Sequence, residues 1–443
     1  MLILKKKLTR LLLAAAMAPV VLFAQSPDQN YILTQTYKTA TTTPSGDINV
    51  AFQDVAYFDG LGRPLQQVSA YTSPVFTGGK PADLVTHTEY DAYGRVSKVY
   101  LPYPHSSGNA AYQSTAPTAA NSYYNSADFT EANSRGYALT EYEASPLNRV
   151  TKQYAGGTDK AVEFLYGVNG SNDVKLYTVS GNTLNQSSYY AANQLSYVET
   201  KDENGDRSRE YKDKQGLVIL KRAYVDKTNN SSNLDTYFVY DDLDRIRFVL
   251  QPTYQDNASA ERYFYYEYND RGLLIKKKVP GAGTTELTYN DRDLLYTSLD
   301  ANKKTTYYKY DALNRLIETG IKAGAVENAL TKIFYDTYPA ELPTFNNNVA
   351  IGYPSTMRSN VTGMQTGTAT LVINPDSSLT TNFLYSAVYY NDRLQVIQEV
   401  KQLYDLGGFR ERSASVLRYD GQLEKKIIYQ QTDKGVNSVE KTY

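Results

Sequence analysis

Few residues in this sequence could carry out catalysis. It contains no cysteine and two histidines, His87 and His105, and neither has a serine or carboxylate at a spacing typical of a catalytic site. Alternation along LVTHTEYD predicts that His87 lies in a strand and shares a face with Val85 and Glu89, whereas His105 is expected in a loop. The sequence has no phosphate-binding, dinucleotide-binding, zinc or nucleophile-elbow motif. We therefore predict no catalytic residue, no cofactor and no metal site.

One acidic segment begins with the spacing of a calcium-binding loop. Asp202, Asn204 and Asp206 occupy the first, third and fifth positions of such a loop. The glycine falls at the fourth position instead of the sixth, and Asp213 instead of glutamate closes the loop. Asn-Gly between two strands is typical of a hairpin turn. We interpret the segment as a turn, with calcium binding as the alternative.

A short pattern containing an Asp and an Arg returns along the chain. An aromatic residue and an acidic or polar residue precede two variable residues, then Gly, Asn or Asp, then Arg or Leu. Tyr268, Tyr289 and Tyr310 begin successive copies at intervals of 21 residues. A catalytic motif would occur once, whereas a recurring period indicates an array of one supersecondary unit. The clear copies are FDGLGRP at 58, YDAYGRV at 90, the stretched copy YEASPLNRV at 142, YKDKQGLV at 211, YDDLDRI at 240, YNDRGLL at 268, YNDRDLL at 289 and YDALNRL at 310.

The copy at 305–320 shows why the pattern predicts a β-hairpin. TTYYKY alternates like a strand, Asp311 can accept a hydrogen bond from a backbone N–H two residues later, and the return strand is expected to start at Arg315. The position before the Arg must adopt a positive φ, which Gly, Asn and Asp tolerate best. In the clear copies this position is Gly62, Gly94, Asn148, Gly216, Asp244, Gly272, Asp293 and Asn314. We interpret the Asp and Arg as turn residues, with a ligand-binding Asp–Arg pair as the alternative.

These repeats resemble those of the RHS family, also called YD-repeat proteins. The resemblance is clear over residues 200–443, and the preceding part resembles the uncharacterised N-terminal domain of many secreted bacterial members. It implies an all-β fold of repeated antiparallel β-hairpins in a spiralling sheet, part of a hollow shell that in full-length members encloses a C-terminal segment, often a toxin. No core-closing segment or toxin domain follows the repeats in this sequence. The expected form is therefore a truncated or split toxin-delivery protein, whose uncapped sheet edge would bind a C-terminal continuation, a neighbouring RHS chain or another copy of itself.

The first residues have the layout of a signal peptide. A basic head precedes an apolar run of 13 residues, Leu11–Phe23, and Ala24 ends the run. Thirteen residues are too few to span a bilayer, which requires about 20. We predict cleavage after Ala24 and export to the periplasm, cell surface or medium, with an uncleaved anchor as the alternative.

Composition agrees with an exported sheet protein that lacks disulfides. The sequence has 43 Tyr and no Trp, and a Tyr ring can pack on a sheet while its hydroxyl reaches water or a backbone group. Its 46 Lys and Arg are interspersed with 47 Asp and Glu, which leaves a net charge of −1. This pattern lacks the basic patch that binds nucleic acid, so no nucleic-acid partner is expected.

Composition shifts suggest three segments. We predict a signal peptide at 1–24, an N-terminal β-rich domain at 25–160 and hairpin repeats at 161–443. Residues 336–380 are rich in Pro, Gly, Asn and Thr, and are predicted to form an irregular insertion that loops out of one repeat. A short helix near 126–134 is expected inside a long surface loop of the N-terminal domain.

Three functional hypotheses follow from this organisation. The first is a non-enzymatic exported structural protein that forms part of an RHS-type β-shell or a cell-surface scaffold. The second is a module that binds a surface glycan or a protein through the Tyr-rich sheet face and residues 336–380. The third is a glycosidase, because carboxylates are numerous enough to supply a catalytic pair.

Overall fold

The chain divides after Glu163 into two compact units, which are described separately below. The computed structural model describes residues 26, 28–38, 47, 49–77, 80–106, 108–126, 135–227, 233–256, 258, 262–348, 353–374, 378–403, 410–418, 421–432 and 435–442. The predicted signal peptide lies outside the described residues, as do residues 127–134 of the segment expected to form a short helix.

The N-terminal unit is an antiparallel sheet with one helix against it. Its elements are β1 (Asn30–Tyr37), β2 (Ala51–Phe58), β3 (Pro64–Ser69), β4 (Phe76–Thr77), β5 (Lys80–Pro81), β6 (Asp83–Tyr90), β7 (Val96–Tyr100), β8 (Tyr103–His105), α2 (Ala116–Tyr124), β9 (Tyr137–Tyr142), β10 (Val150–Tyr154) and the start of β11 (Ala161–Val168). β1 to β3 and β6 pair in that order, β6 then pairs with β7 and β8, and β7 continues through β9 and β10 to β11.

Alternation in β2 sets the core of this unit. Every second residue of β2 is buried, including Val55 and Tyr57, and these side chains pack with Val68 and Val85 of the neighbouring strands. α2 contributes Ala116 and other small side chains to the same core. Small residues let the helix approach the sheet closely, so this part of the molecule has two layers.

The C-terminal unit is a ladder of strands that pair in the order in which they occur. Its elements are β12 (Lys175–Ser180), β13 (Thr183–Tyr189), β14 (Ser196–Lys201), β15 (Arg207–Lys212), β16 (Val218–Tyr224), β17 (Asn233–Tyr240), β18 (Ile246–Leu250), α3 (Pro252–Asp256), β19 (Tyr263–Tyr268), β20 (Leu274–Val279), β21 (Gly283–Tyr289), β22 (Leu295–Leu299), β23 (Thr305–Tyr310), β24 (Leu316–Ala323), β25 (Val326–Asp336), β26 (Val361–Ile373), β27 (Leu379–Tyr390), β28 (Val396–Gln402), β29 (Arg410–Leu417), β30 (Leu423–Thr432) and β31 (Gly435–Thr442).

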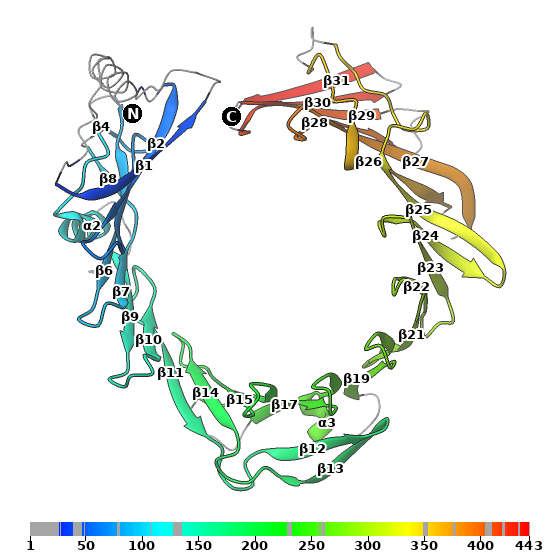
Figure 1. The fold of residues 1–443 in the computed structure, drawn as a ribbon, viewed down its shortest axis with the longest axis horizontal. Helices are drawn as coiled ribbons and strands as arrows, with labels where there is room; N and C mark the ends of the chain where they lie inside the picture. Colours follow the sequence, from blue (N-terminus) through cyan, green and yellow to red (C-terminus); the bar gives the residue numbers. More distant parts are fainter. Residues whose placement is uncertain are drawn as a thin grey trace, which may run out of the picture. The chain divides into compact units, whose positions relative to one another are not determined.

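Antiparallel pairing is unbroken from β14 to β31, and Figure 1 shows these strands following one another in chain order. The β12–β13 hairpin pairs only with itself among the described strands. The all-β fold predicted from the hairpin repeats is thus confirmed. No helix among the described residues is long and apolar enough to cross a bilayer.

The sheet of the C-terminal unit is covered in patches. The β12–β13 hairpin packs over β16–β18 through a core that includes Val174, Leu220 and Phe248. Between Tyr263 and Asp336, all of which the structure describes, Tyr307 has the only fully buried side chain. This stretch is a single layer, so its stability must come from strand pairing and cross-strand side-chain contacts.

Residues 336–380 differ from the predicted insertion. Residues 361–373 of this segment form β26, one of the longest strands, which pairs with both β25 and β27. Only 337–360 interrupts the ladder, and its described residues lie against the sheet: Leu342 packs with Tyr389, and Gln398 exchanges two hydrogen bonds with the backbone of Asn346 at 2.9 Å each. The prediction was wrong for 361–373, which form a paired strand, because composition reports turn content and does not reveal strand pairing.

Candidate functional site

The repeated turn has the geometry that its sequence predicts. The Asp311 carboxylate accepts hydrogen bonds from the backbone N–H groups of Leu313 at 2.8 Å and Arg315 at 2.9 Å. The backbone N–H of Arg315 is the largest influence on Asp311 and, with the Arg315 side chain, holds the pKa of its carboxyl below the usual value against partial desolvation. The return strand begins at Leu316, one residue later than predicted, because Arg315 still belongs to the turn.

Every position predicted to have a positive φ does have one. The values for the eight clear copies are 76° at Gly62, 79° at Gly94, 54° at Asn148, 90° at Gly216, 58° at Asp244, 77° at Gly272, 60° at Asp293 and 65° at Asn314. Two less regular copies, YYNDRLQVI at 389 and RYDGQLEKK at 418, also have a positive φ at this position, 61° at Leu394 and 85° at Gly421, although leucine is not one of the three expected residue types. The residue types at this position were therefore selected for backbone geometry.

The Arg of a turn holds the Asp of the same turn. In the hairpin at 311–315, the Arg315 Nε donates to the Asp311 Oδ2 at 2.7 Å, so both carboxylate oxygens are occupied within the turn. The same pair closes the turns at Asp59–Arg63, Asp91–Arg95 and Asp241–Arg245. These contacts support the structural reading of the Asp–Arg pair over the ligand-binding alternative.

The turn Arg also contacts the Tyr of the following hairpin in four copies, at Arg63, Arg95, Arg245 and Arg315. The Arg315 guanidinium lies 4.4 Å from the ring centroid of Tyr335 and bonds the carboxylate of Asp336, and Arg95 lies 4.3 Å from the ring of Tyr142. Such cation–π contacts contribute roughly 0.5–1 kcal/mol at exposed sites. The recurring Arg therefore joins neighbouring repeats, a role that the sequence pattern alone did not reveal.

The recurring Tyr completes the joint between repeats. In five copies its hydroxyl donates to a backbone carbonyl at the start of the return strand in the preceding hairpin, whereas the Tyr211 hydroxyl donates to Asp173 instead. The observed pairs are Tyr90 with Pro64 at 2.7 Å, Tyr142 with Val96 at 3.0 Å, Tyr240 with Val218 at 2.9 Å, Tyr268 with Ile246 at 3.1 Å and Tyr289 with Leu274 at 2.8 Å. This is the backbone partner that the Tyr-rich composition predicts.

The two histidines are far from the arrangement of a catalytic pair. His87 lies in β6 on the same face as Val85, as predicted, and burial lowers the pKa of its imidazole against the opposing effect of Glu89. His105 was expected in a loop but lies in β8, where it pairs with Asp83 of β6. Among the described residues, no three His, Cys, Asp or Glu side chains are arranged to hold a metal ion. The absence of catalytic and metal sites in the whole chain stays a prediction.

The calcium-like segment forms a turn. The Asp202 Oδ1 accepts from the backbone N–H groups of Asn204 at 2.9 Å and Asp206 at 2.7 Å. The ammonium of Lys227 lies 3.2 Å from the Asp206 carboxylate and donates to the Asn204 carbonyl at 2.6 Å. A cationic side chain thus occupies the place where a calcium ion would need oxygen ligands, which supports the hairpin interpretation.

The densest group of charges lies on the face of β14–β17 that meets the β12–β13 hairpin. Arg222 donates from Nε to Asp235 at 2.8 Å and from NH1 to Asp173 at 2.7 Å, and Asp173 also accepts from the Tyr211 hydroxyl at 2.8 Å. Burial opposes the charge of Arg222, but the two carboxylates outweigh burial and raise its pKa. The sequence pattern does not reveal this cluster, because Asp173 is distant in the chain from Arg222 and Asp235.

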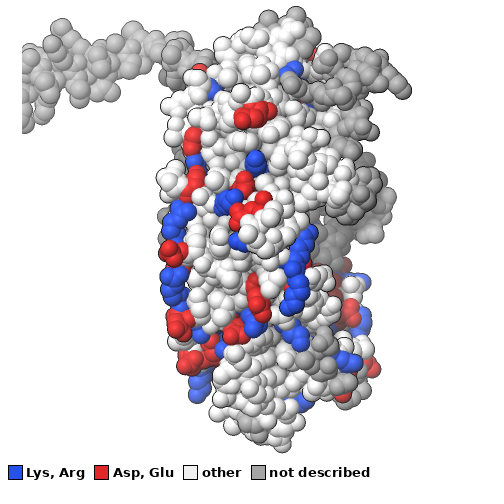
Figure 2. Space-filling view, turned by 90° about the vertical axis from the view of Figure 1, so that its right-hand side faces the viewer, with Lys and Arg blue, Asp and Glu red and all other residues white. Residues whose placement is uncertain are grey.

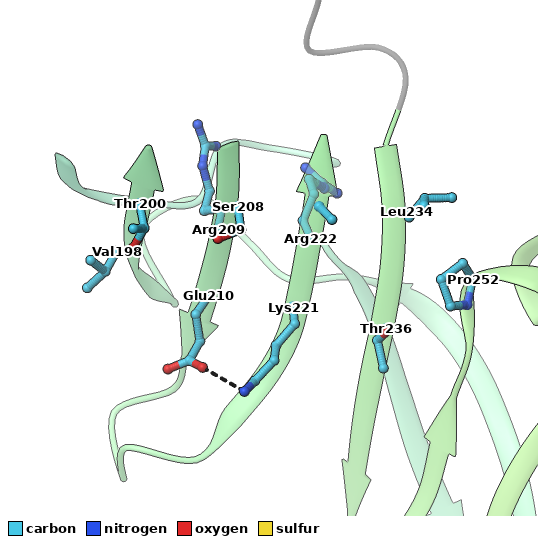
Figure 3. A pocket seen from close by; sticks show the side chains of 11 residues that line it. Val198, Thr200, Ser208, Arg209, Glu210, Lys221, Arg222, Leu234, Thr236 and Pro252 are labelled. Carbon is cyan, nitrogen blue, oxygen red and sulfur yellow. Dashed lines mark ion pairs between the residues drawn. The ribbon is translucent and has the colours of Figure 1, made fainter. Parts of the chain in front are cut away.

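Two hollows lie beside strands β14–β17. The larger, of about 650 Å³, includes Thr200, Ser208, Ala223 and Thr236 in its lining (Figure 3). Glu210 and Lys221 form an ion pair of 3.1 Å beside it. The smaller hollow, of about 290 Å³, lies between β12–β13, β17 and α3 and is lined in part by the Arg222 cluster.

Surface charge forms no patch of a single sign on the face shown in Figure 2. Basic and acidic side chains are interspersed there, and at the left margin of the view they alternate in a column. Lys309, for example, bonds Glu318 at 2.9 Å and Glu327 at 3.1 Å across neighbouring strands. The electrostatic footprint of a nucleic-acid-binding surface is absent from this face.

Solved toxin structures share this fold at low sequence identity. The crystal structure of TcdB2–TccC3 without its hypervariable C-terminal region aligns with a TM-score of 0.55 and 13% identity over 98% of this chain and 21% of that chain. The crystal structure of TcdB2–TccC3 with Cdc42 gives 0.53 and 13% over 93% and 20%. The Photorhabdus luminescens Tc holotoxin pore gives 0.54 and 12% over 93% and 19%. The RHS-like fold is thereby confirmed, and the chain spans about a fifth of the length of the chains it matches.

One family model matches the N-terminal part. Residues 32–163 match a domain of unknown function, DUF6443. A search of curated proteins finds no match to this sequence. The matched segment ends at the last residue of the N-terminal unit, Glu163.

Proposed function

We propose that this chain is an exported, non-enzymatic structural protein of the YD-repeat type that forms a section of an RHS-like β-shell or a cell-surface scaffold. The observation that carries the proposal is the unbroken antiparallel pairing from β14 to β31, with successive hairpins joined by the recurring Tyr and Arg. Repeat arrays of this kind obtain their stability from interfaces between neighbours and extend as one body.

The thin middle of the sheet supports a role as a wall. From β19 to β25 the sheet has half-buried residues on both faces, and Tyr307 is the only fully buried side chain there. A globular core would bury one face of each strand against another layer. We infer that this section separates two aqueous compartments, as the wall of a shell does.

A section of a toxin-related shell with more than one component is the specific form that we favour. The fold neighbours are toxin complexes that contain more than one component, and this chain spans about a fifth of their length. A second RHS-type chain or a C-terminal continuation is then the expected partner, paired at a sheet edge.

The test combines localisation with shape. An epitope inserted in the exposed turn at 202–206 reports the position of the chain in fractionated and in intact cells. We expect the protein outside the cytoplasm, and we expect electron microscopy of the purified exported protein to show a thin wall in place of a compact particle. Retention in the cytoplasm or a compact solid particle would overturn the proposal. Hydrolysis of any polysaccharide in a panel incubated with the same preparation would show that the protein is an enzyme.

A further inference from the structure

The hollow of about 290 Å³ has features of a ligand site that the structural role does not require. Three elements that are distant in the chain build it: the β12–β13 hairpin, the start of β17 and the short helix α3. Its volume lies just below the range for small-molecule sites, about 300–1,000 Å³. It therefore has room for one small ring-sized group.

Ion pairs and hydrogen bonds fix the positions of the polar side chains at the base of this hollow. Arg222 lies between the carboxylates of Asp173 and Asp235, which it contacts at 2.7 and 2.8 Å. The Lys175 Nζ and the Tyr177 hydroxyl donate to the Gln255 Oε1 at 3.0 and 3.1 Å. Groups fixed in this way lose little further entropy when a ligand binds.

The rim offers polar groups that are unused. Among the described residues, the side chains of Asn172, Asn233 and Asp256 make no hydrogen bond or ion pair. Amides both donate and accept, and a carboxylate accepts, so this set complements neighbouring hydroxyl groups. With Asp173, Asp235, Lys175 and Arg222, the lining carries three carboxylates and two cations, which disfavours an anionic ligand.

Apolar surface lies beside these polar groups. The ring of Tyr189 is 42% exposed and the side chain of Leu234 is 49% exposed, and Pro252 also lines the hollow. A sugar ring presents hydroxyl groups around its edge and C–H groups on its faces. A site with amides, carboxylates and an exposed aromatic ring matches both.

We propose that this hollow binds one residue of a neutral carbohydrate. Asn172, Asn233 and Asp256 would bond its hydroxyl groups, and Tyr189 would contact its C–H face. The larger hollow is a weaker candidate, because no aromatic side chain lines it and its one pair of opposite charges, Glu210 and Lys221, is already joined. The proposal stands independently of a role in a shell wall.

The test uses the purified full-length chain. Its binding to immobilised neutral oligosaccharides is measured first. Saturation-transfer NMR then measures its binding to methyl glycosides of hexoses and N-acetylhexosamines in solution. We expect binding to at least one glycan class, and a loss of about tenfold or more in affinity for Asn172→Ala combined with Tyr189→Ala. Both residues are at the surface, so the fold should persist, as circular dichroism would verify.

Two controls separate this site from its surroundings. Lys221→Ala changes the larger hollow and should leave glycan binding unchanged. Asp256→Asn keeps an acceptor and should retain most of the affinity, whereas Asp256→Ala should lower it. Absence of glycan binding by the unaltered protein, or equal binding by the Asn172 and Tyr189 double variant, would overturn the proposal. Neither result would bear on the structural role.

Discussion

At the scale of single residues, the conformation of one backbone position explains the recurring Gly, Asn and Asp. We predict that Asn314→Gly is close to neutral, because glycine adopts the observed φ of 65° freely but loses the bond from Arg292 to the Asn314 side chain at 2.7 Å. Asn314→Val should lower the free energy of unfolding by about 1–2 kcal/mol, because a β-branched residue is strained there. Urea denaturation compares the two variants, and equal stability would show that this turn geometry is wrong.

A second prediction at this scale concerns pH. Hydrogen bonds from Arg315, then the backbone N–H of Gly363, lower the pKa of Asp336 to about 2, from the usual 3.8. A carboxyl whose pKa is lower in the folded state stabilises the protein fully above the unfolded pKa. That contribution should be lost as the pH falls from about 4 towards 2.

The matched variant is Asp336→Asn, because Asn tolerates the φ of 67° at this position. Free energies of unfolding measured between pH 2 and pH 6 should depend less on pH in the variant than in the unaltered protein. An identical pH dependence of the two proteins would contradict the assigned role of Asp336.

At the scale of elements, the contacts between hairpins can be tested one hydroxyl at a time. Tyr268→Phe removes the bond to the Ile246 carbonyl and should cost about 0.5–1.5 kcal/mol. Tyr266 lies on the same strand, and its hydroxyl has no hydrogen bond to a described residue. Tyr266→Phe should therefore change the free energy of unfolding little. Equal effects of the two changes would show that the hydroxyl contact contributes nothing.

Close approach of strands gives a second test at this scale. Gly320 lies opposite Tyr307, and a Cβ added there would lie 2.1 Å from the Asn328 carbonyl oxygen and 2.7 Å from the Tyr307 ring. Gly320→Ala should destabilise the protein by about 1–3 kcal/mol, because the neighbouring strand must move. Gly170 has open space around it, so Gly170→Ala serves as the control. Thermal unfolding of both variants measures the difference, and equal melting temperatures would refute the close contact.

At the scale of the whole molecule, export is the property to test. The basic head and the 13-residue apolar run predict cleavage after Ala24 and a mature protein that begins at Gln25. Intact-mass measurement of periplasmic or secreted material should show this N terminus. The matched control is a chain with Leu12→Lys and Leu13→Lys, which interrupts the apolar run and should remain in the cytoplasm. A mass that retains Met1 in exported material would contradict cleavage.

The sequence determined the local structure of the repeats. Tyr310, Asp311 and Asn314 specify a strand end, a side-chain-capped turn and a left-handed residue, and each effect acts within about five residues along the chain. Because the pattern recurs along the chain, these local effects predict one hairpin after another and hence the all-β ladder. The positive φ values of the eight clear copies show that backbone geometry favours Gly, Asn and Asp there, although Leu394 also adopts a positive φ in a less regular copy.

Tertiary structure decided what covers the sheet and which distant groups meet. Composition predicted a loop at 361–373. In the folded chain this segment forms β26 and pairs with β25 on one side and β27 on the other. The Arg222 cluster joins Asp173 to Asp235 across 62 residues of sequence, and local patterns carry no information about such a meeting. Burial and hydrogen bonding depend on where whole elements pack, which is why the hollow beside α3 and the contacts between repeats appeared only in the folded chain.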